Sequence, residues 1–452
     1  MHSQRDEGGV RKPSILIVSY LFPPMGGIAV QRALSLARYL PQSGYDVHVL
    51  KARNAAGPVY DSSLLKHVPD SISIHSAFTP EIPFELRQRI WKWISHSTGS
   101  VRLPGSARPA GGPSLATRLA QRVFCPEPEI VWVPFAVRAA RRVVRRHHID
   151  AVLVTAPPFS AFLVGTALKT SFPNLKLISD FRDEWLTFYL NNNEFQSNAY
   201  TRRRAAEIER TTVELSDLVV AVTESSLREI RERYPTQPHT KFHCLPNGYD
   251  PVVLADFKPR RHEGRRVIVT HMGTIYKNSS PRYYLKALDS LPEEARERFE
   301  TRFIGRVVDG ERPFLDSSLS PVKILGFMPQ SEAFRYVEET DYLLLTMTDP
   351  ISIPGKFYEY MATGKPILAL SPPDGEVQQI LRETGAGWCA DPGDQQAIRQ
   401  MLLRALAQAE AGSCEYEPNW EAIRRYERPR LVEEYGGLIR DALESAQVVA
   451  EK

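Results

Sequence analysis

Four charges and two aromatic rings gather in six residues, Asp180-Phe181-Arg182-Asp183-Glu184-Trp185. They follow a predicted buried strand at residues 175–178, and parallel sheets place functional side chains at the carboxyl ends of such strands. A preorganised carboxylate there can stabilise positive charge that develops on a substrate. We therefore take Asp183, Asp180 and Arg182 as candidate catalytic residues, with Asp183 toward the substrate and Asp180 in a bracing role. An Arg182–carboxylate network that only braces the loop is the alternative.

Two glycine-containing segments are suited to binding phosphate. Gly26 and Gly27 lie between a predicted strand and a predicted helix, where backbone amides can approach an anion at a helix N-terminus. Gly273 and Lys277 follow the predicted strand at 267–270 and can clamp a phosphate through an amide and a charge. An ordinary strand-to-helix turn and a surface lysine are the respective alternatives.

The segment at residues 353–366 reads Ile-Pro-Gly-Lys-Phe-Tyr-Glu-Tyr-Met-Ala-Thr-Gly-Lys-Pro. Gly355 opens a predicted helix, so Lys356 and Glu359 share a face at i, i+3. A carboxylate in the first turn can accept both hydroxyls of a ribose, while Lys356 and the helix N-terminus meet a diphosphate. A simple surface ion pair between the two side chains is the alternative.

The order of apolar runs predicts the scaffold for these residues. Predicted strands alternate with helical stretches, which favours parallel sheets covered on both faces. The predicted strands are 15–18, 47–50, 151–154, 175–178, 218–222, 267–270, 303–304, 322–325, 342–345 and 366–370. Residues 235–265, rich in Pro, Gly, Lys and Arg, indicate a linker. The predicted fold is α/β, with two doubly wound halves and ligands at strand ends and in the cleft between the halves.

Together these residues resemble a GT-B glycosyltransferase, most similar to glycosyltransferase family 4, over nearly the whole chain. Family members usually carry a Glu-x7-Glu motif followed by a small-residue helix and Gly-x-Pro. Glu359 matches the second Glu, and Gly364-Lys365-Pro366 matches the tail. The first Glu, which helps hold the transferred sugar in the family, would fall at Ile351. A sub-branch with Asp-Phe-Arg-Asp-x-Trp and Lys-x-x-Glu-Tyr blocks resembles this chain most. No catalytic His is carried over, because Pro157-Pro158-Phe159-Ser160 stands where many relatives place one.

The resemblance implies retaining transfer of a sugar from a nucleotide-sugar donor, two Rossmann-like domains facing a cleft, and no required metal or other cofactor. The sequence agrees on the metal, because no Asp-x-Asp pair stands in a plausible metal loop. Cationic side chains and helix N-termini must then meet the diphosphate charge. The expected donor-binding residues are Gly26, Gly27, Gly273, Lys277, Arg306, Phe327, Lys356 and Glu359.

The expected domains follow from the element order and the resemblance. Residues 1–240 form the N-terminal acceptor domain, with a flexible insertion at about 95–122. Residues 241–425 form the C-terminal donor domain. The closing segment, 419–445, has helical spacing with a break at Pro429. In the family such a segment crosses back, so residues 426–452 are expected to form a helix that returns to the N-terminal domain.

Composition excludes several other classes of protein. The chain has 452 residues, of which 42% are hydrophobic and 24% charged, which is typical of globular domains and not of a disordered chain. A net charge of +4 does not indicate nucleic acid as a partner. Four scattered cysteines, no apolar run of 18 residues and a polar N-terminus favour a cytoplasmic location. His147-His148 ends an Arg-rich helix and is better interpreted as a solvated terminus than as a metal site, so no metal site is predicted.

One region is strongly basic. Residues 81–150 contain twelve Lys or Arg and five Asp or Glu, a surplus of seven positive charges. Residues 84–94 mix cations with aromatic rings, and five arginines between 138 and 146 add a second basic face. An anionic membrane surface is one expected partner, with a peripheral location on the inner face of the cell membrane. A solvated charged helix with ordinary core aromatics is the alternative.

Three functions fit these observations. The first is a hexosyltransferase-type glycosyltransferase acting on a glycan, lipid-linked or other small acceptor in the synthesis of cell-surface polysaccharides or glycoconjugates. The second is a sugar-nucleotide epimerase on the GT-B architecture. The third is a non-catalytic GT-B subunit that binds nucleotide, a reading motivated by Ile351.

Overall fold

The structure, a computed structural model, describes residues 11–55, 59–80, 122–190, 198–260, 266–411 and 415–450. The chain divides into two compact units. Unit 1 contains Met1–Val222, Ser226–Leu245 and Val432–Lys452, and unit 2 contains Thr223–Ser225 and Pro246–Leu431. The segment at 84–94 and all but the last residue of the predicted insertion lie outside the described residues.

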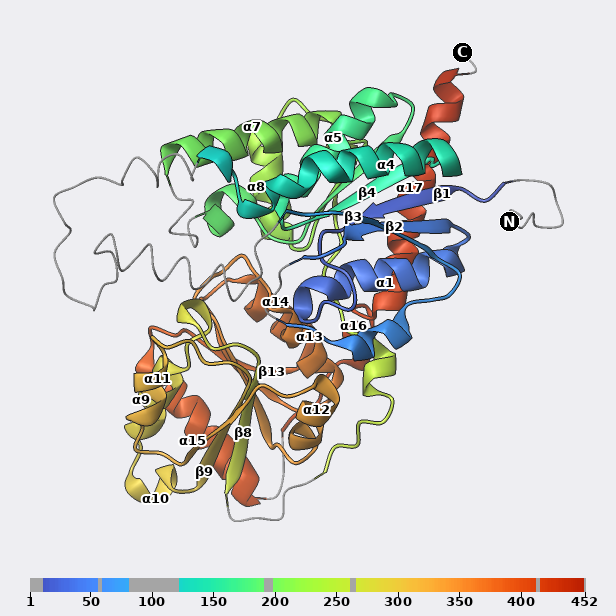
Figure 1. Ribbon diagram of the computed structural model, residues 1–452. Coiled ribbons are helices and arrows are strands. Elements are labelled where there is room, and N and C mark those ends of the chain that lie inside the picture. Colours follow the sequence, from blue (N-terminus) through green and yellow to red (C-terminus); the bar gives the residue numbers. More distant parts are fainter. Residues whose placement is uncertain are drawn as a thin grey trace. The chain divides into compact units, whose positions relative to one another are not determined.

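Unit 1 is built on a seven-stranded parallel sheet in the order β3-β2-β1-β4-β5-β6-β7 (Figure 1). Its strands are β1 (Ser14–Val18), β2 (Asp46–Ala52), β3 (Ser73–Ala77), β4 (Ala151–Ala156), β5 (Lys176–Phe181), β6 (Leu218–Ala221) and β7 (Phe242–Cys244). Every residue of β1 and β4 is buried, which explains their continuous apolar sequences. The strand order reverses between β1 and β4, so this is the switch point of the sheet.

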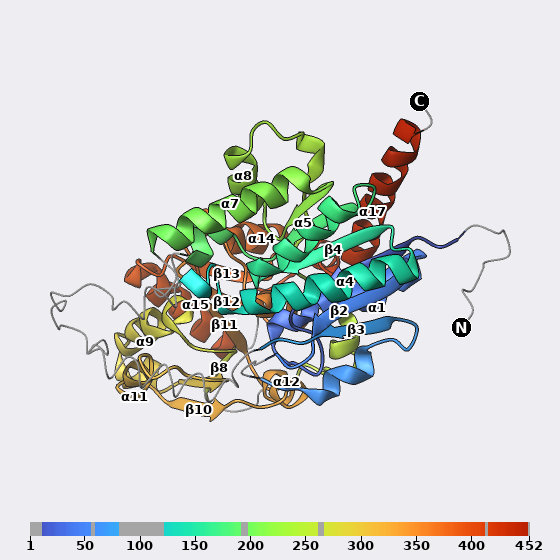
Figure 2. The ribbon, with the colours of Figure 1, turned by 45° about the horizontal axis from the view of Figure 1, so that its top comes forward.

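Helices cover both faces of this sheet, with α4, α5 and α7 on one face and α1 on the other (Figures 1 and 2). These helices are α1 (Gln31–Tyr39), α4 (Val133–His147), α5 (Phe162–Ser171), α7 (Ala199–Leu215) and α8 (Glu224–Arg233). One apolar core cluster runs through the strands and these helices, including Trp132, Phe159 and Phe162.

Unit 2 has a six-stranded parallel sheet in the order β10-β9-β8-β11-β12-β13. Its strands are β8 (Val267–Met272), β9 (Phe299–Ile304), β10 (Val322–Gly326), β11 (Tyr342–Thr346), β12 (Ile367–Leu370) and β13 (Gly387–Ala390). The order reverses between β8 and β11, which makes this pair the switch point of the second sheet.

Two core clusters lie on the two faces of the second sheet. One contains apolar residues of α9 and α15, and the other contains those of α12, α13 and α14. The helices are α9 (Arg282–Asp289), α10 (Glu293–Arg296), α11 (Arg312–Asp316), α12 (Gln330–Glu338), α13 (Gly355–Ala362), α14 (Glu376–Thr384), α15 (Gln395–Ala411) and α16 (Trp420–Arg424). The fold is therefore α/β with two Rossmann-like doubly wound units, as predicted.

The last helix, α17 (Arg428–Ala450), begins in unit 2 and continues in unit 1. Val432, Tyr435 and Ile439 belong to the core of unit 1. The Tyr45 hydroxyl donates a hydrogen bond to the Gly436 carbonyl at 2.6 Å. The helical break precedes Arg428, and Pro429 is tolerated in the first turn because no intrahelical bond is lost there. None of the helices in the described ranges is long and apolar enough to cross a lipid bilayer.

The structure differs from the prediction at three edge strands, β3, β7 and β13, and the last of these, like β3, was not predicted at all. Part of the predicted linker is β7, which adds a strand to the sheet of unit 1. The edge strand β3 was not predicted, because its sequence, Ser-Ile-His-Ser-Ala, contains only two strongly or weakly apolar residues. All three are short edge strands, where burial no longer imposes an apolar run.

Candidate functional site

The first turn of α13 lies at the switch point of unit 2. Pro354 is its N-cap and has no side chain that could accept a hydrogen bond from the first amides. Phe357, Tyr358 and Met361 are buried and fix the helix in the core. The helix therefore presents an uncapped N-terminus, with its positive dipole end, on a rigid element.

Lys356, the second residue of α13, is held by a buried histidine. Its Nζ lies 2.9 Å from His271 Nε2 and 3.4 Å from Ser279 Oγ. His271 Nδ1 lies 3.0 Å from the carbonyl oxygen of Leu344. A carbonyl can only accept, so Nδ1 carries the hydrogen and Nε2 accepts from Lys356. His271 is on β8 and Leu344 is on β11, so the two strands of the switch point together position the ammonium group.

The surroundings of Lys356 disfavour its charged form when no anion is bound. Burial lowers the pKa of Lys356 to about 7. Burial, together with the Lys356 charge, lowers the pKa of His271 well below its usual range, so this partner is neutral. Among the described residues no carboxylate is paired with Lys356. A partly buried lysine without a carboxylate partner is suited to accept an anionic ligand.

Three consecutive loops meet at the carboxyl ends of β8, β9 and β10. The Gly273 amide donates to the Ile304 carbonyl at 2.8 Å, and the Gly305 amide donates to the Gly326 carbonyl at 2.7 Å. Gly273 has φ of 118°, and a Cβ at this position would lie 3.4 Å from Lys356 Nζ. A side chain there would strain the backbone and crowd the ammonium group, so the glycine keeps this surface open.

Glu359 lies one turn after Lys356 but does not pair with it. Its Oε1 accepts a hydrogen bond of 2.8 Å from Gln330 Nε2, at the start of α12. Burial raises the pKa of Glu359, while Arg428 and the hydrogen bond from Gln330 oppose that rise. The surface ion pair that was the alternative for Lys356 and Glu359 is therefore not formed. Each side chain has its own partner and a separate position.

Lys277, Arg306 and Phe327 lie on the same three loops. Lys277 begins a short 3-10 helix, Lys277–Ser279, and both cations are exposed. The Ile275 amide donates to the Arg306 carbonyl at 2.8 Å, which ties the loops after β8 and β9 together. Phe327 is 68% exposed, a high value for an aromatic side chain. The structure brings all the unit 2 candidates to one edge of the second sheet.

In unit 1, Gly26 and Gly27 follow β1 and precede α1. The Gly26 amide donates to the Val59 carbonyl at 2.9 Å, and a Cβ on Gly26 would lie 2.9 Å from the Val59 side chain. Gly27 has φ of 86° and open space around its Cα. The first glycine therefore serves close packing of the chain, and the second serves backbone conformation.

Asp180 is the fifth residue of β5 and is fully buried. Arg32 binds it in a fork, with Nε and Nη2 at 3.0 and 2.7 Å from Oδ1 and Nε at 2.9 Å from Oδ2. The Thr155 hydroxyl donates to Oδ2 at 2.6 Å. A carboxylate with this many donors is fixed in place, which favours the bracing role for Asp180.

The neighbours of Asp180 differ in their surroundings. The Arg182 guanidinium donates to the carbonyl oxygens of Ala29 and Pro157, in the loops after β1 and β4. Glu184 is buried and pairs with Arg233 at 2.6 Å. Asp183 is partly exposed. Of the three carboxylates in this segment, Asp183 is therefore the most accessible.

Sequence reasoning missed Arg32 and His271. Arg32 lies in the first turn of α1, a helix that also contains Arg38, so the sequence does not single it out. His271 is the fifth residue of a fully buried strand, and a titratable side chain there needs a partner. Their roles depend on which strands are neighbours in the sheets. The sequence around either residue does not show this.

The two halves of the chain match two family models. Residues 100–253 match Glycosyltransferase Family 4, and residues 266–408 match Glycosyl transferases group 1. The second match contains Lys356 and Glu359. Together the matches support a GT-B protein of the glycosyltransferase family 4 type.

Two curated relatives match short parts of the chain. The amylovoran biosynthesis glycosyltransferase AmsK of Erwinia amylovora is 39% identical over 95 residues, 20% of this chain and 23% of that protein. The probable glycosyltransferase WbjE of Pseudomonas aeruginosa is 25% identical over 148 residues, 32% of this chain and 37% of that protein. The chain thus matches less than two fifths of the length of each of these relatives.

Solved structures share the fold over nearly the whole chain. Sucrose-phosphate synthase from Thermosynechococcus elongatus has a TM-score of 0.66 at 14% identity, covering 96% of this chain and all of that chain. Anabaena HepE in complex with UDP and glucose has a TM-score of 0.60 at 14% identity, covering 94% and 99%. At such low identity these likenesses show the GT-B fold alone.

Proposed function

We propose that this protein is a retaining glycosyltransferase that uses a nucleotide-sugar donor in the synthesis of a cell-surface polysaccharide or glycoconjugate. The Lys356 arrangement carries the proposal. It combines a partly buried ammonium group that lacks a carboxylate partner among the described residues with an uncapped helix N-terminus at a switch point. Nucleotide-binding doubly wound sheets place phosphates at such a point. The two family matches and the names of both curated relatives support glycosyl transfer as the reaction.

The donor lies along the carboxyl edge of the second sheet in this proposal. Lys356 and the amides that open α13 bind the diphosphate, and Lys277 and Arg306 add charge from the loops after β8 and β9. Glu359 accepts hydrogen bonds from the ribose. Phe327 and its loop contact the base. Gly273 leaves room for the phosphates.

Charge stabilisation by side chains replaces a metal ion in this mechanism. Lys356 takes up a proton from solvent when the donor binds, and its ammonium group then meets the negative charge that the diphosphate gains as the sugar–phosphate bond breaks. No other cofactor is needed. The donor phosphate accepts the proton of the acceptor hydroxyl, so no strong separate base is required.

Asp183 orients the acceptor or the sugar, with Asp180 and Arg182 fixing the loop that carries it. Asp180 is locked by Arg32, and Arg182 joins the loops after β1 and β4. These bonds hold the backbone of Asp183 at the switch point of unit 1, where preorganisation is most useful.

Ile351 departs from the family pattern and bears on the two alternatives. Its amide and that of Ser352 donate to Asp349 at 3.3 and 2.8 Å, which forms a turn before α13. The sugar is then held without the usual first carboxylate. An epimerase would convert a nucleotide sugar with no acceptor present, and a non-catalytic subunit would bind nucleotide without turnover.

A thermal-shift panel of nucleotide sugars, followed by assays of hydrolysis and transfer, tests the proposal. A ligand at 100 times its dissociation constant adds about 2.7 kcal/mol to the free energy of unfolding. We expect stabilisation by one class of donor, slow hydrolysis without acceptor and faster consumption with acceptor. Stabilisation by no nucleotide, or conversion to an epimer alone, would contradict it.

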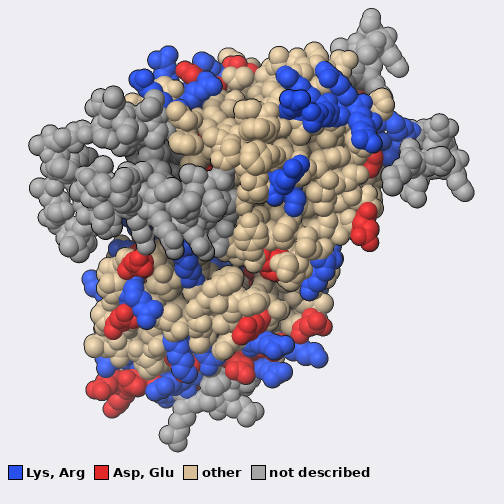
Figure 3. Space-filling model, viewed as in Figure 1, with Lys and Arg blue, Asp and Glu red and all other residues tan. Residues whose placement is uncertain are grey.

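We also propose a lipid-linked acceptor and a peripheral location on the inner face of the cell membrane. Arg138, Arg141, Arg142, Arg145 and Arg146 are all exposed on α4. Figure 3 shows Lys and Arg gathered over this part of unit 1. Anionic lipid attracts such a face. The protein should sediment with vesicles containing phosphatidylglycerol and not with phosphatidylcholine alone, and a variant with Gln at 141, 142 and 145 should lose that binding. Equal sedimentation with both lipids would count against it.

A further inference from the structure

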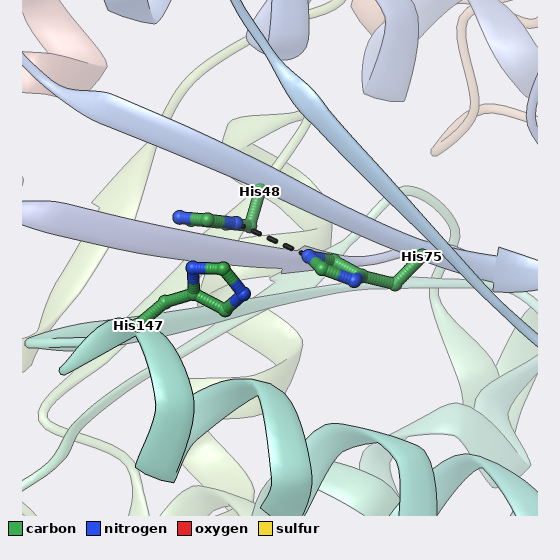
Figure 4. A group of neighbouring side chains, drawn as sticks. All are labelled: His48, His75 and His147. Atoms are coloured by element: carbon green, nitrogen blue, oxygen red, sulfur yellow. Dashed lines mark hydrogen bonds between the residues drawn. The ribbon is translucent and has the colours of Figure 1, made fainter. Parts of the chain in front are cut away.

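Three histidines converge on one face of the first sheet, and none of them belongs to the candidate donor-binding or catalytic residues. His48 is on β2, His75 is on the edge strand β3, and His147 ends α4 (Figure 4). His48 Nδ1 lies 3.1 Å from His75 Nε2. The ring centroid of His147 is 4.4 Å from that of His48 and 5.4 Å from that of His75. One nitrogen from each ring lies within 4.8 Å of the other two.

The fold brings these rings together from distant parts of the sequence. Leu50 pairs with His75 across the parallel β2–β3 ladder, and His48 is two residues before Leu50. Side chains two residues apart in a strand share a face, so His48 and His75 project to the same side. Helix α4 packs on that side through Ala140, Val143 and Val144, and its last residue, His147, completes the group.

The rings of His48 and His75 are held in surroundings that favour the neutral form. Burial, together with His48, His147 and Arg146, lowers the pKa of His75 to about 4. Burial also lowers the pKa of His48. Neutral imidazole is the form that binds a metal. The arginine charge beside His75 opposes a cation, and the carboxylate of Asp46 offsets it.

Asp46 also gives His48 a defined orientation. Its Oδ2 lies 3.4 Å from His48 Nε2, the ring nitrogen opposite the one that faces His75. His48 is 2% exposed, and its Nε2 has no hydrogen bond of good geometry. A carboxylate behind a histidine nitrogen is the arrangement that orients metal-bound histidines and raises their basicity.

We propose that His48, His75 and His147 bind a divalent first-row transition-metal ion, with zinc as the best match. Three imidazole nitrogens leave a fourth position of a tetrahedral site for water. Nitrogens bound to one zinc ion lie about 3.3 Å apart, close to the distance that already separates His48 and His75. His147 completes the site by a side-chain rotation, because it is only half-buried at the end of its helix.

The site is structural. His48 is the third residue of β2 and lies toward the amino end of that strand, whereas Gly26 and Gly27 follow the carboxyl end of β1 and Asp180 lies near the carboxyl end of β5. A metal ion there would tie the edge strand β3 and the end of α4 to β2. Binding to the folded chain and not to the unfolded chain would raise stability by mass action.

Titration of the full-length, tag-free, chelator-stripped protein with Co2+ tests the proposal. Four-coordinate Co2+ gives a visible absorption that reports binding directly. We expect saturation at one Co2+ per chain, displacement by Zn2+, and a higher melting temperature with Zn2+. His75→Asn and His147→Asn should each weaken binding at least a hundredfold, the upper end of the effect of losing an outer partner alone.

His148→Asn is the matched control. His148 is exposed and adjacent to His147, and its backbone is left-handed with φ of 50°, which Asn tolerates. This variant should bind Co2+ as the parent does. Absence of saturable binding by the parent would overturn the proposal without any variant. So would parental affinity in folded His75→Asn and His147→Asn proteins, with folding checked by circular dichroism.

Discussion

Lys356 is expected to bind the donor and to destabilise the protein when no donor is bound. Replacing it by Met should therefore weaken donor binding and stabilise the ligand-free protein. Burial lowers the folded-state pKa of Lys356 to about 7, against a usual value of 10.5. Between these two values the unfolded chain binds more protons than the folded protein. The free energy of unfolding therefore rises with pH across this window.

The size of the effect follows from the two pKa values. From pH 7 to pH 9.5 this single group should add about 3 kcal/mol to the stability of the parent, at about 1.4 kcal/mol per unit of pKa difference. Lys356→Met has no such group, and Met has a similar length. The difference in stability between the two proteins should therefore favour the variant at pH 7 and shrink toward pH 9.5. Urea unfolding at both pH values measures it.

The parent should bind nucleotide more tightly than the Lys356→Met variant, although the variant is the more stable protein at pH 7. A diphosphate raises the pKa of Lys356, so the parent should take up close to one proton per bound nucleotide at pH 8. Isothermal titration in two buffers of different ionisation enthalpy measures that uptake. The variant should bind roughly 10- to 100-fold more weakly, from the loss of a charged hydrogen bond worth about 1.5–3 kcal/mol. Tight nucleotide binding by the parent without proton uptake, or a variant less stable at pH 7, would refute this reasoning.

Four further outcomes are expected. Glu359→Gln should weaken donor binding by about 1–3 kcal/mol in titration calorimetry, because a charged acceptor for the ribose is lost; unchanged affinity would remove Glu359 from the site. Asp183→Asn should lower turnover tenfold or more, about 1.4 kcal/mol, with donor affinity nearly unchanged, whereas joint loss of affinity and melting temperature would make it a structural residue. Arg32→Gln should cost about 3–5 kcal/mol in urea unfolding, because it leaves the carboxylate of Asp180 buried without its partner; a loss below 1 kcal/mol would contradict the fork. Turnover should persist in EDTA well below the melting temperature, and complete loss reversed by magnesium would disprove the charge-only mechanism.

Much of the fold could be predicted from apolar runs. Strands such as β1 and β4 are buried on both faces, so their sequences are continuous and conspicuous. The helix predicted to open at Gly355 is α13, which begins at that residue, and its buried face is apolar. The edge strands β3, β7 and β13 were not predicted, because an edge strand is less buried and its sequence has no continuous apolar run.

Candidate residues that lie on one helix could be predicted from the sequence. Partners that come from other strands and helices could not, because their positions depend on the order of the strands. Lys356 and Glu359 are on one helix, so their spacing alone placed them together. The histidine that holds Lys356 comes from a strand 85 residues earlier, and the arginine that locks Asp180 comes from a helix 148 residues earlier. The His147-His148 pair was interpreted as a solvated helix end because the two other rings come from β2 and β3.

The residues at the switch point of unit 2 explain why Lys356 is positioned by a neutral partner and not by a carboxylate. A carboxylate partner would hold the ammonium charged and satisfied, and an incoming diphosphate would have to displace it. The chain instead supplies a neutral imidazole, whose tautomer is fixed by the Leu344 carbonyl on the neighbouring strand. This partner positions Nζ at 2.9 Å without providing a counter-charge. The negative charge that completes the pair must then come from the ligand, and most strongly from a leaving diphosphate, which is where catalysis needs the stabilisation.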